Sequence, residues 1–277
     1  MKLPYMTNDL YRFFASSIPK NVKLLLKNRY NKVNSFLAYG KMDMFTACDI
    51  EINSECNLKC SYCPVSVFGS GESYMQESLF TKIIDNLADI KYEGRISPSF
   101  YGEPFLDDRL IKLLSYARKK LPKAQLIIHS NGTKINKKIY RDLVDIVGID
   151  GIFITKHLPK YPKPLLSLIN DELDAKKYIK LREIDDLIVF NRGGTIDHNK
   201  GTHTMKKCYF LSDQIAITYK GNVVCSNDFH SKEIYGDVNN NHLVQEIWHG
   251  EAFTSRRKRL RQGKFDAEVC KVCSGNN

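Results

Sequence analysis

Three cysteines within eight residues constrain this chain more than any other feature. Cys56, Cys60 and Cys63 have the spacing CxxxCxxC and directly follow an apolar, strand-like run over 45–52. Thiolates are the ligands of iron–sulfur clusters, and a compact loop can present three of them to one [4Fe–4S] cluster. The fourth iron then has no protein ligand and can bind a small molecule. A zinc knuckle and a disulfide scaffold are the alternatives, but zinc prefers paired CxxC or Cys/His patterns.

The composition indicates a folded protein in a reducing compartment. The chain has 277 residues, of which 43% are hydrophobic, enough for one substantial domain and a small appendage. No apolar run approaches the roughly eighteen residues of a membrane span, and residues 1–8 lack the apolar region of a secretion signal. We therefore expect no transmembrane segment and a cytoplasmic location, where the eight cysteines remain reduced.

The formal net charge of +11 is compatible with nucleic acid, an acidic lipid surface or an anionic substrate. The densest basic run, over 256–259 with Arg261 beyond it, is interpreted as the solvated face of a helix. The sequence contains no helix-turn-helix, RNP or zinc-finger pattern, so we expect no nucleic-acid partner. Residues 8–37 have a helical pattern that fits either a helix closing the bottom of the main domain or a basic amphipathic helix at a membrane surface.

Short apolar runs alternate with amphipathic segments from residue 45 onward. Strands are predicted over 46–52, 96–101, 124–130, 150–155 and near 186–190, and helices over 76–90, 107–120, 136–147 and about 165–180, with Asp107 as a helix cap. Such alternation produces a parallel sheet or barrel. Because the stretch is too short for eight units, we expect an α/β fold in the form of a partial (β/α) TIM-like barrel.

Polar residues follow these predicted strands, at the edge where barrels place their chemistry. Gly-Glu-Pro and Asn-Gly are each ordinary turn sequences, but every such group falls at the same edge, and the set together indicates a site. The groups are Gly102-Glu103-Pro104, Ser130-Asn131-Gly132-Thr133, Thr155-Lys156-His157 and Asn191-Arg192-Gly193-Gly194.

Four further cysteines follow residue 200, where the strand–helix alternation ends. Cys208 and Cys225 bracket a predicted β-hairpin over 214–225, and Cys270 and Cys273 form a CxxC pair after a helix predicted over 251–262. We call these four the tail cysteines. From the residues alone, a structural zinc site and an iron–sulfur site are equally acceptable. The eighth cysteine, Cys48, lies early in the first strand and is expected to be buried.

The cysteine loop, residues 56–63, resembles that of the radical SAM enzymes, whose motif is CxxxCxΦC with an aromatic residue at Φ, here Tyr62. The resemblance implies that the open iron binds S-adenosylmethionine (SAM), which yields a 5′-deoxyadenosyl radical that abstracts hydrogen from the substrate. In that family the segment matching Gly102, Glu103 and Pro104 binds the methionine ammonium of SAM, although the family form has glycine where this chain has Tyr101. Ser130 and Asn131 match positions that contact cofactor or substrate.

The tail resembles the SPASM/twitch extension of some radical SAM enzymes, in its Gly-x-x-x-Cys, Gly-Asp-Val, Glu-Ile-Trp and closing CxxC sequences. Four cysteines fit the shorter twitch form with one auxiliary cluster, so the resemblance implies two [4Fe–4S] clusters. It also implies a barrel over 45–200 and a β-hairpin/helix extension over 201–277, and the helical pattern of residues 8–37 places an N-terminal helical segment over 1–44 before them. The electron donor would be a flavodoxin or ferredoxin.

Twitch-bearing members include dehydrogenases of small polar substrates, and Arg192 matches an arginine that contacts substrate in them. The resemblance thus implies oxidation of a hydroxyl carbon on a small sugar- or cyclitol-like molecule, with the auxiliary cluster accepting an electron. The net positive charge of the chain would suit an anionic substrate. His157 is a candidate base and Lys156 a candidate for orienting the hydroxyl. The alternatives are modification of a peptide or protein and a non-catalytic metal-binding protein. No spare thiol lies at the strand ends, which disfavours epimerisation.

Overall fold

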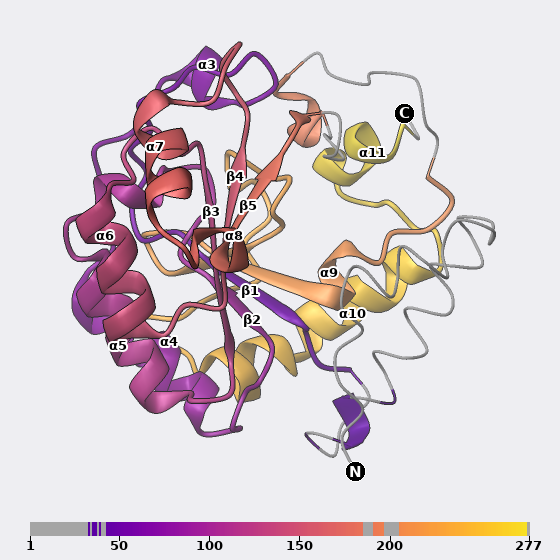
Figure 1. The fold of residues 1–277 in the computed structure, drawn as a ribbon. Coiled ribbons are helices and arrows are strands. Elements are labelled where there is room, and N and C mark those ends of the chain that lie inside the picture. Colours follow the sequence, from indigo (N-terminus) through magenta and orange to yellow (C-terminus); the bar gives the residue numbers. More distant parts are fainter. Residues whose placement is uncertain are drawn as a thin grey trace. The chain divides into compact units, whose positions relative to one another are not determined.

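The computed structural model describes residues 33, 35–37, 39, 43–184, 191–196 and 205–275 (Figure 1). The chain divides into two compact units, Met1–Thr46 and Ala47–Asn277. In the first unit the described residues include a helical stretch around Ser35, whose hydroxyl donates a hydrogen bond to the carbonyl oxygen of Met44 at 3.5 Å. Most of the region 8–37, for which a helix is predicted, lies outside the described residues.

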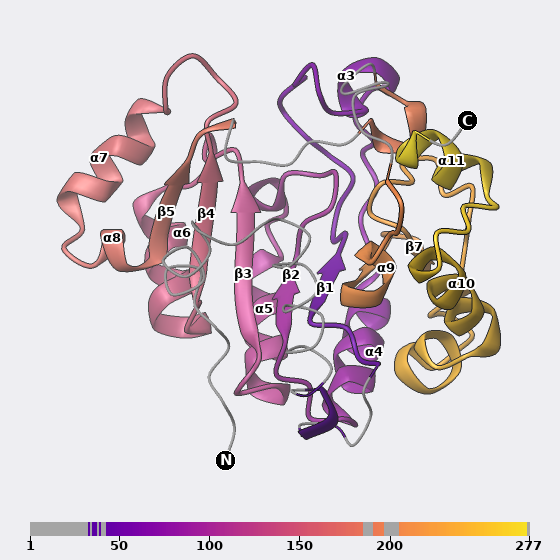
Figure 2. The same cartoon turned by 90° about the vertical axis from the view of Figure 1, so that its right-hand side faces the viewer.

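The second unit is built on one open, eight-stranded sheet with the order β5-β4-β3-β2-β1-β6-β7-β8 (Figure 2). Its first five strands pair in parallel, each with the next along the chain. They are β1 (Ala47–Ile50), β2 (Arg95–Ser97), β3 (Gln125–Ser130), β4 (Gly151–Thr155) and β5 (Ile179–Arg182). Because β5 and β8 are the two edges, the sheet does not close, and the predicted α/β partial barrel is confirmed.

Helices α4 (Glu77–Ala88), α5 (Leu110–Lys120) and α6 (Lys137–Arg141) cover one face of this sheet (Figures 1 and 2). Apolar residues recur on α4 at i, i+1 and i+4, and its Ile83, Ile84 and Leu87 are fully buried. Alternate residues of the strands, such as Ile96 and Ile128, are also fully buried. The hydrophobic core therefore lies between the sheet and these helices.

Shorter helices complete the barrel part of the chain. They are α3 (Val65–Phe68), the 3₁₀ turn Pro104–Leu106, a π-helical stretch Asp142–Val147, α7 (Lys163–Asp171) and α8 (Ala175–Tyr178). Asp107 was predicted to cap α5, but Arg109 is the residue that directly precedes this helix. The Asp107 carboxylate nevertheless accepts a hydrogen bond from the Arg109 N–H at 3.0 Å.

The predicted hairpin is confirmed and is continuous with the main sheet. Strand β6 (Gln214–Ile217) pairs in parallel with β1, and β7 (Asn222–Val224) pairs antiparallel with β6. Gly221 allows the turn between them, because its φ of +94° suits glycine. The remaining elements are the 3₁₀ turn Arg192–Gly194, α9 (Phe210–Asp213), β8 (Gly236–Asp237), a π-helical stretch Leu243–Trp248, α10 (Glu251–Arg261) and α11 (Glu268–Ser274).

The structure contains a parallel strand, β5, that was not predicted from the sequence. The structure forms β5 over Ile179–Arg182, which begins within the last two residues of the helix predicted over about 165–180, and the predicted strand near 186–190 lies outside the described residues. The leucine-rich run continues helically only to Asp171, after which α8 adds one turn. Only Ile179 of β5 is buried, and Leu181 is 41% exposed, so this edge strand lacks the apolar signal of the inner ones.

The basic run on α10 is only partly solvated, which corrects its interpretation. Arg257 is 1% exposed, lies 3.9 Å from the centre of the Trp248 ring and donates a hydrogen bond to the Trp248 carbonyl at 2.8 Å. Arg256 forms an ion pair with Glu233. These two arginines hold α10 against the preceding segment. None of the described helices is long and apolar enough to cross a membrane.

Candidate functional site

The cysteine loop follows β1, at the edge of the sheet where the parallel strands end. Its chain turns at the second and third cysteines, where the Cys63 N–H donates to the Cys60 carbonyl at 2.9 Å. All three thiols are free and partly buried. Burial, together with the negative charges of Glu103, Cys63 and Cys60, raises the pKa of Cys56 to about 11, against a hydrogen bond from the Leu58 backbone that lowers it. The three thiols therefore lie close enough on one loop to affect one another's pKa, as ligands of a single cluster must.

Tyr62 links this loop to the end of β4. Its hydroxyl contacts Nδ1 of His157 and also hydrogen-bonds the Cys60 thiol. A hydroxyl has one proton to donate, and a thiolate is its stronger acceptor. Burial raises the pKa of the Cys60 thiol, but as a cluster ligand it would be a thiolate. In that state the His157 Nδ1–H would donate to the tyrosine oxygen, and Nε2 would keep its lone pair. Burial lowers the pKa of His157, which favours this neutral ring.

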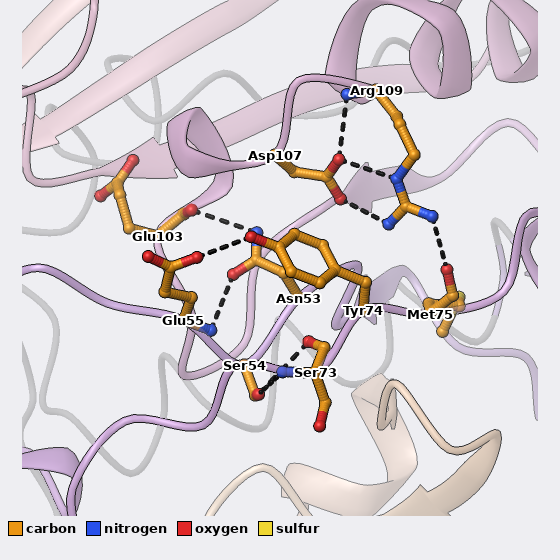
Figure 3. A network of polar contacts seen from close by, with 9 residues as sticks. All are labelled: Asn53, Ser54, Glu55, Ser73, Tyr74, Met75, Glu103, Asp107 and Arg109. Atoms are coloured by element: carbon orange, nitrogen blue, oxygen red, sulfur yellow. Dashed lines mark hydrogen bonds and ion pairs between the residues drawn. The ribbon is translucent and has the colours of Figure 1, made fainter.

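The segment after β2 packs directly on the segment before the cysteine loop (Figure 3). A Cβ atom on Gly102 would lie 2.1 Å from the carbonyl oxygen of Asn53, so only glycine fits there. The Asn53 amide donates to the Glu103 carbonyl at 3.2 Å, and the Glu103 N–H donates to the Glu55 carbonyl at 2.6 Å. Pro104 is buried and starts the following 3₁₀ turn.

Glu103 joins the ends of β2 and β3 through its buried carboxylate. Oε1 accepts the Ser130 hydroxyl at 2.7 Å and the Phe105 N–H at 3.1 Å, while Oε2 accepts the Asn131 N–H at 2.9 Å. The Asn131 amide in turn donates to Asn57 of the cysteine loop at 3.0 Å. The predicted cofactor-binding residues are therefore brought together, and the side chains of Glu103 and Ser130 point at each other. Burial raises the pKa of Glu103, and these donors oppose the rise.

Arg192 lies between the two groups of cysteines. Its positive charge lowers the pKa of both Cys63 and Cys273, although burial raises both overall. One guanidinium nitrogen donates to the Asn227 side chain at 3.0 Å and to the Ser226 carbonyl at 3.4 Å. Its buried Nε has no hydrogen-bond partner among the described residues. This nitrogen is a donor available to a bound molecule.

Lys156 points to a different partner. Its ammonium forms an ion pair with Glu183 and lies 5.7 Å from the centre of the Tyr161 ring. Its backbone N–H donates to the Arg182 carbonyl at 2.9 Å. These contacts hold Lys156 against the end of β5, and they favour a structural role over the orientation of a hydroxyl.

The four tail cysteines line one apolar pocket. Leu211, Leu260, Phe265 and Val269 also line it, and these side chains make the surroundings of the thiols apolar. Burial raises the pKa of Cys270 to about 12 and that of Cys273 to about 11. Four thiols that line one apolar pocket fit an iron–sulfur cluster with no open iron. Cys48, by contrast, is fully buried in β1, as predicted.

Gly193 and Gly194 let the chain approach α11, which carries Cys270 and Cys273. Both glycines have positive φ, and a Cβ atom would lie 2.5 Å from Val269 at the first and 2.7 Å from Val272 at the second. The Gly193 N–H also hydrogen-bonds the Cys273 thiol. These glycines therefore allow the segment over 191–196 to pack closely against α11.

No three histidine, cysteine or carboxylate side chains in the described part of the chain converge closely enough to hold one metal ion. Ligands of a single zinc ion must meet at one point. Thiolates that bind different iron atoms of one cluster stand farther apart than the ligands of a single ion.

A row of polar and aromatic side chains on the inner face of the sheet was missed. Asp49 lies between Cys48 and Ile50, which point to the helices, so it points the other way. Arg95 donates to the Asp49 carboxylate and contacts Nε2 of His129, both at 2.8 Å. Burial and the charges of Arg95 and Arg182 lower the pKa of His129 to about 3, so this histidine is neutral. The inner row consists of Asp49, Arg95, His129, Phe153 and Arg182. Charged residues inside apolar strands were the available signal.

A partial barrel with three cysteines after its first strand and four more in a hairpin extension defines an iron–sulfur enzyme. The chain belongs to the radical SAM superfamily, whose family model matches residues 50–157, and the iron–sulfur cluster-binding SPASM domain matches residues 208–274. It is an oxidoreductase of this superfamily, and its cofactors are two [4Fe–4S] clusters and SAM.

Several relatives support this assignment. The chain is 32% identical to an S-adenosyl-L-methionine-dependent 2-deoxy-scyllo-inosamine dehydrogenase of Niallia circulans, over 83% of this chain and 93% of the relative. The crystal structure of BtrN in complex with AdoMet and 2-DOIA matches with a TM-score of 0.76 at 31% identity, covering 84% of this chain and 94% of BtrN. BtrN in an open conformation matches with a TM-score of 0.65 at 29% identity, covering 84% and 93%.

Proposed function

We propose that this enzyme oxidises a hydroxyl-bearing carbon of a small cyclitol- or sugar-like molecule. The observation that carries the proposal is the inner row, which lines the inner face of the barrel with a carboxylate, two guanidinium groups and a neutral imidazole. Such groups match the hydroxyl groups of a polyol. The 2-deoxy-scyllo-inosamine dehydrogenase named above, which is similar over most of the chain, acts on a molecule of this class.

Cofactor binding is assigned to the two cysteine groups and the strand ends. Cys56, Cys60 and Cys63 would hold the first cluster, and the tail cysteines the second. Backbone groups of Gly102, Glu103 and Pro104, supported by Ser130 and Asn131, would hold SAM, with Tyr62 beside it. When bound, these cofactors supply the radical that removes a hydrogen atom from the substrate carbon.

Arg192 and His157 are the residues we assign to the hydroxyl group. Oxidation of a secondary alcohol to a ketone releases one hydrogen atom, one proton and one electron. The unpartnered Nε of Arg192 can donate to the hydroxyl oxygen and stabilise it as the proton leaves. His157, neutral and with Nε2 free as derived above, can accept that proton. Lys156 would act only if its ion pair with Glu183 opened.

The tail cysteines would hold the acceptor of the electron, because four thiolate ligands leave no iron open for substrate. A flavodoxin or ferredoxin would donate the electron that starts the reaction. Both clusters would be protected in a reducing cytoplasm, which also suits eight free cysteines. We assign the barrel to residues 45–200 and the extension to 201–277, after an N-terminal segment over 1–44.

The test is a product assay with anaerobically reconstituted enzyme, dithionite and SAM. We expect 2-deoxy-scyllo-inosamine, or another polyol of a panel of cyclitols and aminosugars, to give a ketone and 5′-deoxyadenosine in equal amounts. Omission of the polyol should leave only slow, uncoupled 5′-deoxyadenosine formation. Formation of 5′-deoxyadenosine without a ketone from any member of the panel would contradict the proposal.

A further inference from the structure

A second pocket lies beside the cysteine loop, and the reaction proposed above does not use it. We call it the Glu51 pocket. Its volume is about 350 Å³, which is within the range of small-molecule sites. Its wall comes from segments that follow β1, α3, β2 and β7, together with the β6–β7 turn. The lining includes Glu51, Phe100, Tyr101, Lys220, Phe229 and His230.

Glu51 is the distinctive group of this pocket. It is 5% exposed, and its carboxylate accepts the backbone N–H of Tyr219 at 3.1 Å and the backbone N–H of Tyr101. Among the residues that the structure describes, no cationic side chain forms an ion pair with it. A buried carboxylate without a cationic partner is costly, and burial raises the pKa of Glu51 to about 7. A cation in the pocket would keep this carboxylate ionised.

Aromatic rings form the rest of the wall. The centres of the Phe100 and Tyr101 rings are 4.3 Å apart, and those of Tyr101 and Phe229 are 4.9 Å apart. Faces of aromatic rings attract ammonium groups. One such contact already exists here, because the exposed Lys220 ammonium lies 5.6 Å from the centre of the Tyr219 ring.

We propose that the Glu51 pocket binds a small organic molecule through its ammonium group, with Glu51 as the counter-ion and the aromatic rings as walls. This proposal does not depend on the reaction proposed above. The pocket nevertheless adjoins the active site, because Tyr101 also contacts Arg192. An occupied pocket would restrain the Tyr101 ring and so affect the position of Arg192.

Three probes of similar shape test the proposal by calorimetric titration of the reconstituted holoenzyme: cyclohexylammonium, cyclohexanol and cyclohexanecarboxylate. We expect the cation to bind at least about tenfold more tightly than the alcohol or the acid. Equal binding of cation and alcohol would overturn the proposal. Tighter binding of the acid would also overturn it and would assign the pocket to Lys220 instead.

Substitutions locate the binding. We expect Glu51→Gln to weaken cyclohexylammonium binding about tenfold or more, whereas Glu72→Gln, which makes the same change on an exposed loop, should leave it unchanged. Unchanged binding by Glu51→Gln overturns the proposal. Iron content and circular dichroism report whether the variants fold. If Glu51→Gln does not fold, Phe229→Leu provides the test instead. Loss of the Phe229 ring should weaken cyclohexylammonium binding several-fold. Unchanged affinity would contradict the proposal that aromatic rings form the wall of the site.

Discussion

The guanidinium carbon of Arg192 lies 5.7 Å from the centre of the Tyr101 ring, and both side chains donate to the carbonyl oxygen of Ser226, at 3.4 and 2.9 Å. Tyr101 stands where radical SAM enzymes usually have the first glycine of Gly-Gly-Glu-Pro. The Arg192 guanidinium packs over the Tyr101 ring, and the Tyr101 hydroxyl holds the segment after Cys225 through its hydrogen bond to Ser226. This departure from the family pattern therefore connects the end of β2 with the tail site.

Arg192→Lys should separate SAM cleavage from substrate oxidation. Lysine keeps the charge but loses the planar fork that contacts Ser226, Asn227 and the Tyr101 ring. We expect ketone formation to fall about 10²–10³-fold, the effect of losing one donor to a developing oxyanion, while 5′-deoxyadenosine still forms. Arg259→Lys, on the exposed side of α10, is the matched control. Equal loss of both products would place Arg192 in SAM binding instead.

Single cysteine substitutions should show which cysteines bind each of the two clusters. The wild-type chain should bind about eight iron and eight sulfide atoms, and Cys60→Ala and Cys270→Ala about four each. Cys60→Ala should abolish SAM cleavage. Cys270→Ala should retain it and lose oxidation. Iron analysis and chromatography of 5′-deoxyadenosine measure these outcomes, and loss of all iron from either variant would show that the sites are not independent.

Gly193→Ala should damage the tail site through α11. A Cβ atom there would lie 2.5 Å from Val269, so α11 must move and carry Cys270 and Cys273 with it. We expect iron to fall from about eight towards about four atoms per chain. Gly69→Ala is the control, because Gly69 also has positive φ but no atom within 4 Å of the added Cβ. Addition of Val269→Ala should restore iron to Gly193→Ala, and failure of this rescue would refute the steric explanation.

Glu51 should make stability depend on pH. Its pKa is raised from 4.5 to about 7 in the folded chain, so the folded state binds the proton more tightly. The stabilising contribution of the protonated group is complete below about pH 4.5 and is lost as pH rises to about 7. Relative to Glu51→Gln, which does not titrate, the wild-type free energy of unfolding should fall by about 3 kcal/mol over this range.

Anaerobic urea denaturation at several pH values measures this difference. The other titratable groups that line the pocket are Tyr101, Tyr219, Lys220 and His230. Both proteins contain them, so their effects cancel in the comparison. If the difference in free energy of unfolding between wild type and Glu51→Gln is the same from pH 5 to pH 8, Glu51 does not cause the pH dependence of stability.

Periodicity and spacing predicted the parts of the fold that bury apolar residues. Strands β1 to β4 and helices α4 and α5 have continuous or regularly spaced apolar residues, and each lies within a few residues of its prediction. Strand β5 could not be found this way, because an edge strand with one buried residue has no apolar pattern. The burial of Arg257 was equally hidden, since its partners Trp248 and Phe253 are defined only by tertiary packing.

At the site, the sequence indicated which residues gather but not what each one contacts. Gly102, Glu103, Ser130 and Asn131 do meet at the strand ends, yet the carboxylate of Glu103 binds the chain itself. The pairing of Lys156 with Glu183 depends on β5, a strand that was not predicted over Ile179–Arg182 from the sequence. The inner row depends on which face each strand residue occupies, and that follows only from the register of the pairing.

The parallel pairing of β1 with β6 has a consequence for protein engineering. Ala47 to Ile50 are in register with Gln214 to Ile217, so the strand that leads into the cysteine loop also anchors the hairpin between Cys208 and Cys225. A chimera that exchanges the C-terminal part between superfamily members must therefore match this ladder in register. A shift of two residues would preserve the side-chain alternation while moving one cysteine group about 7 Å along the strand relative to the other.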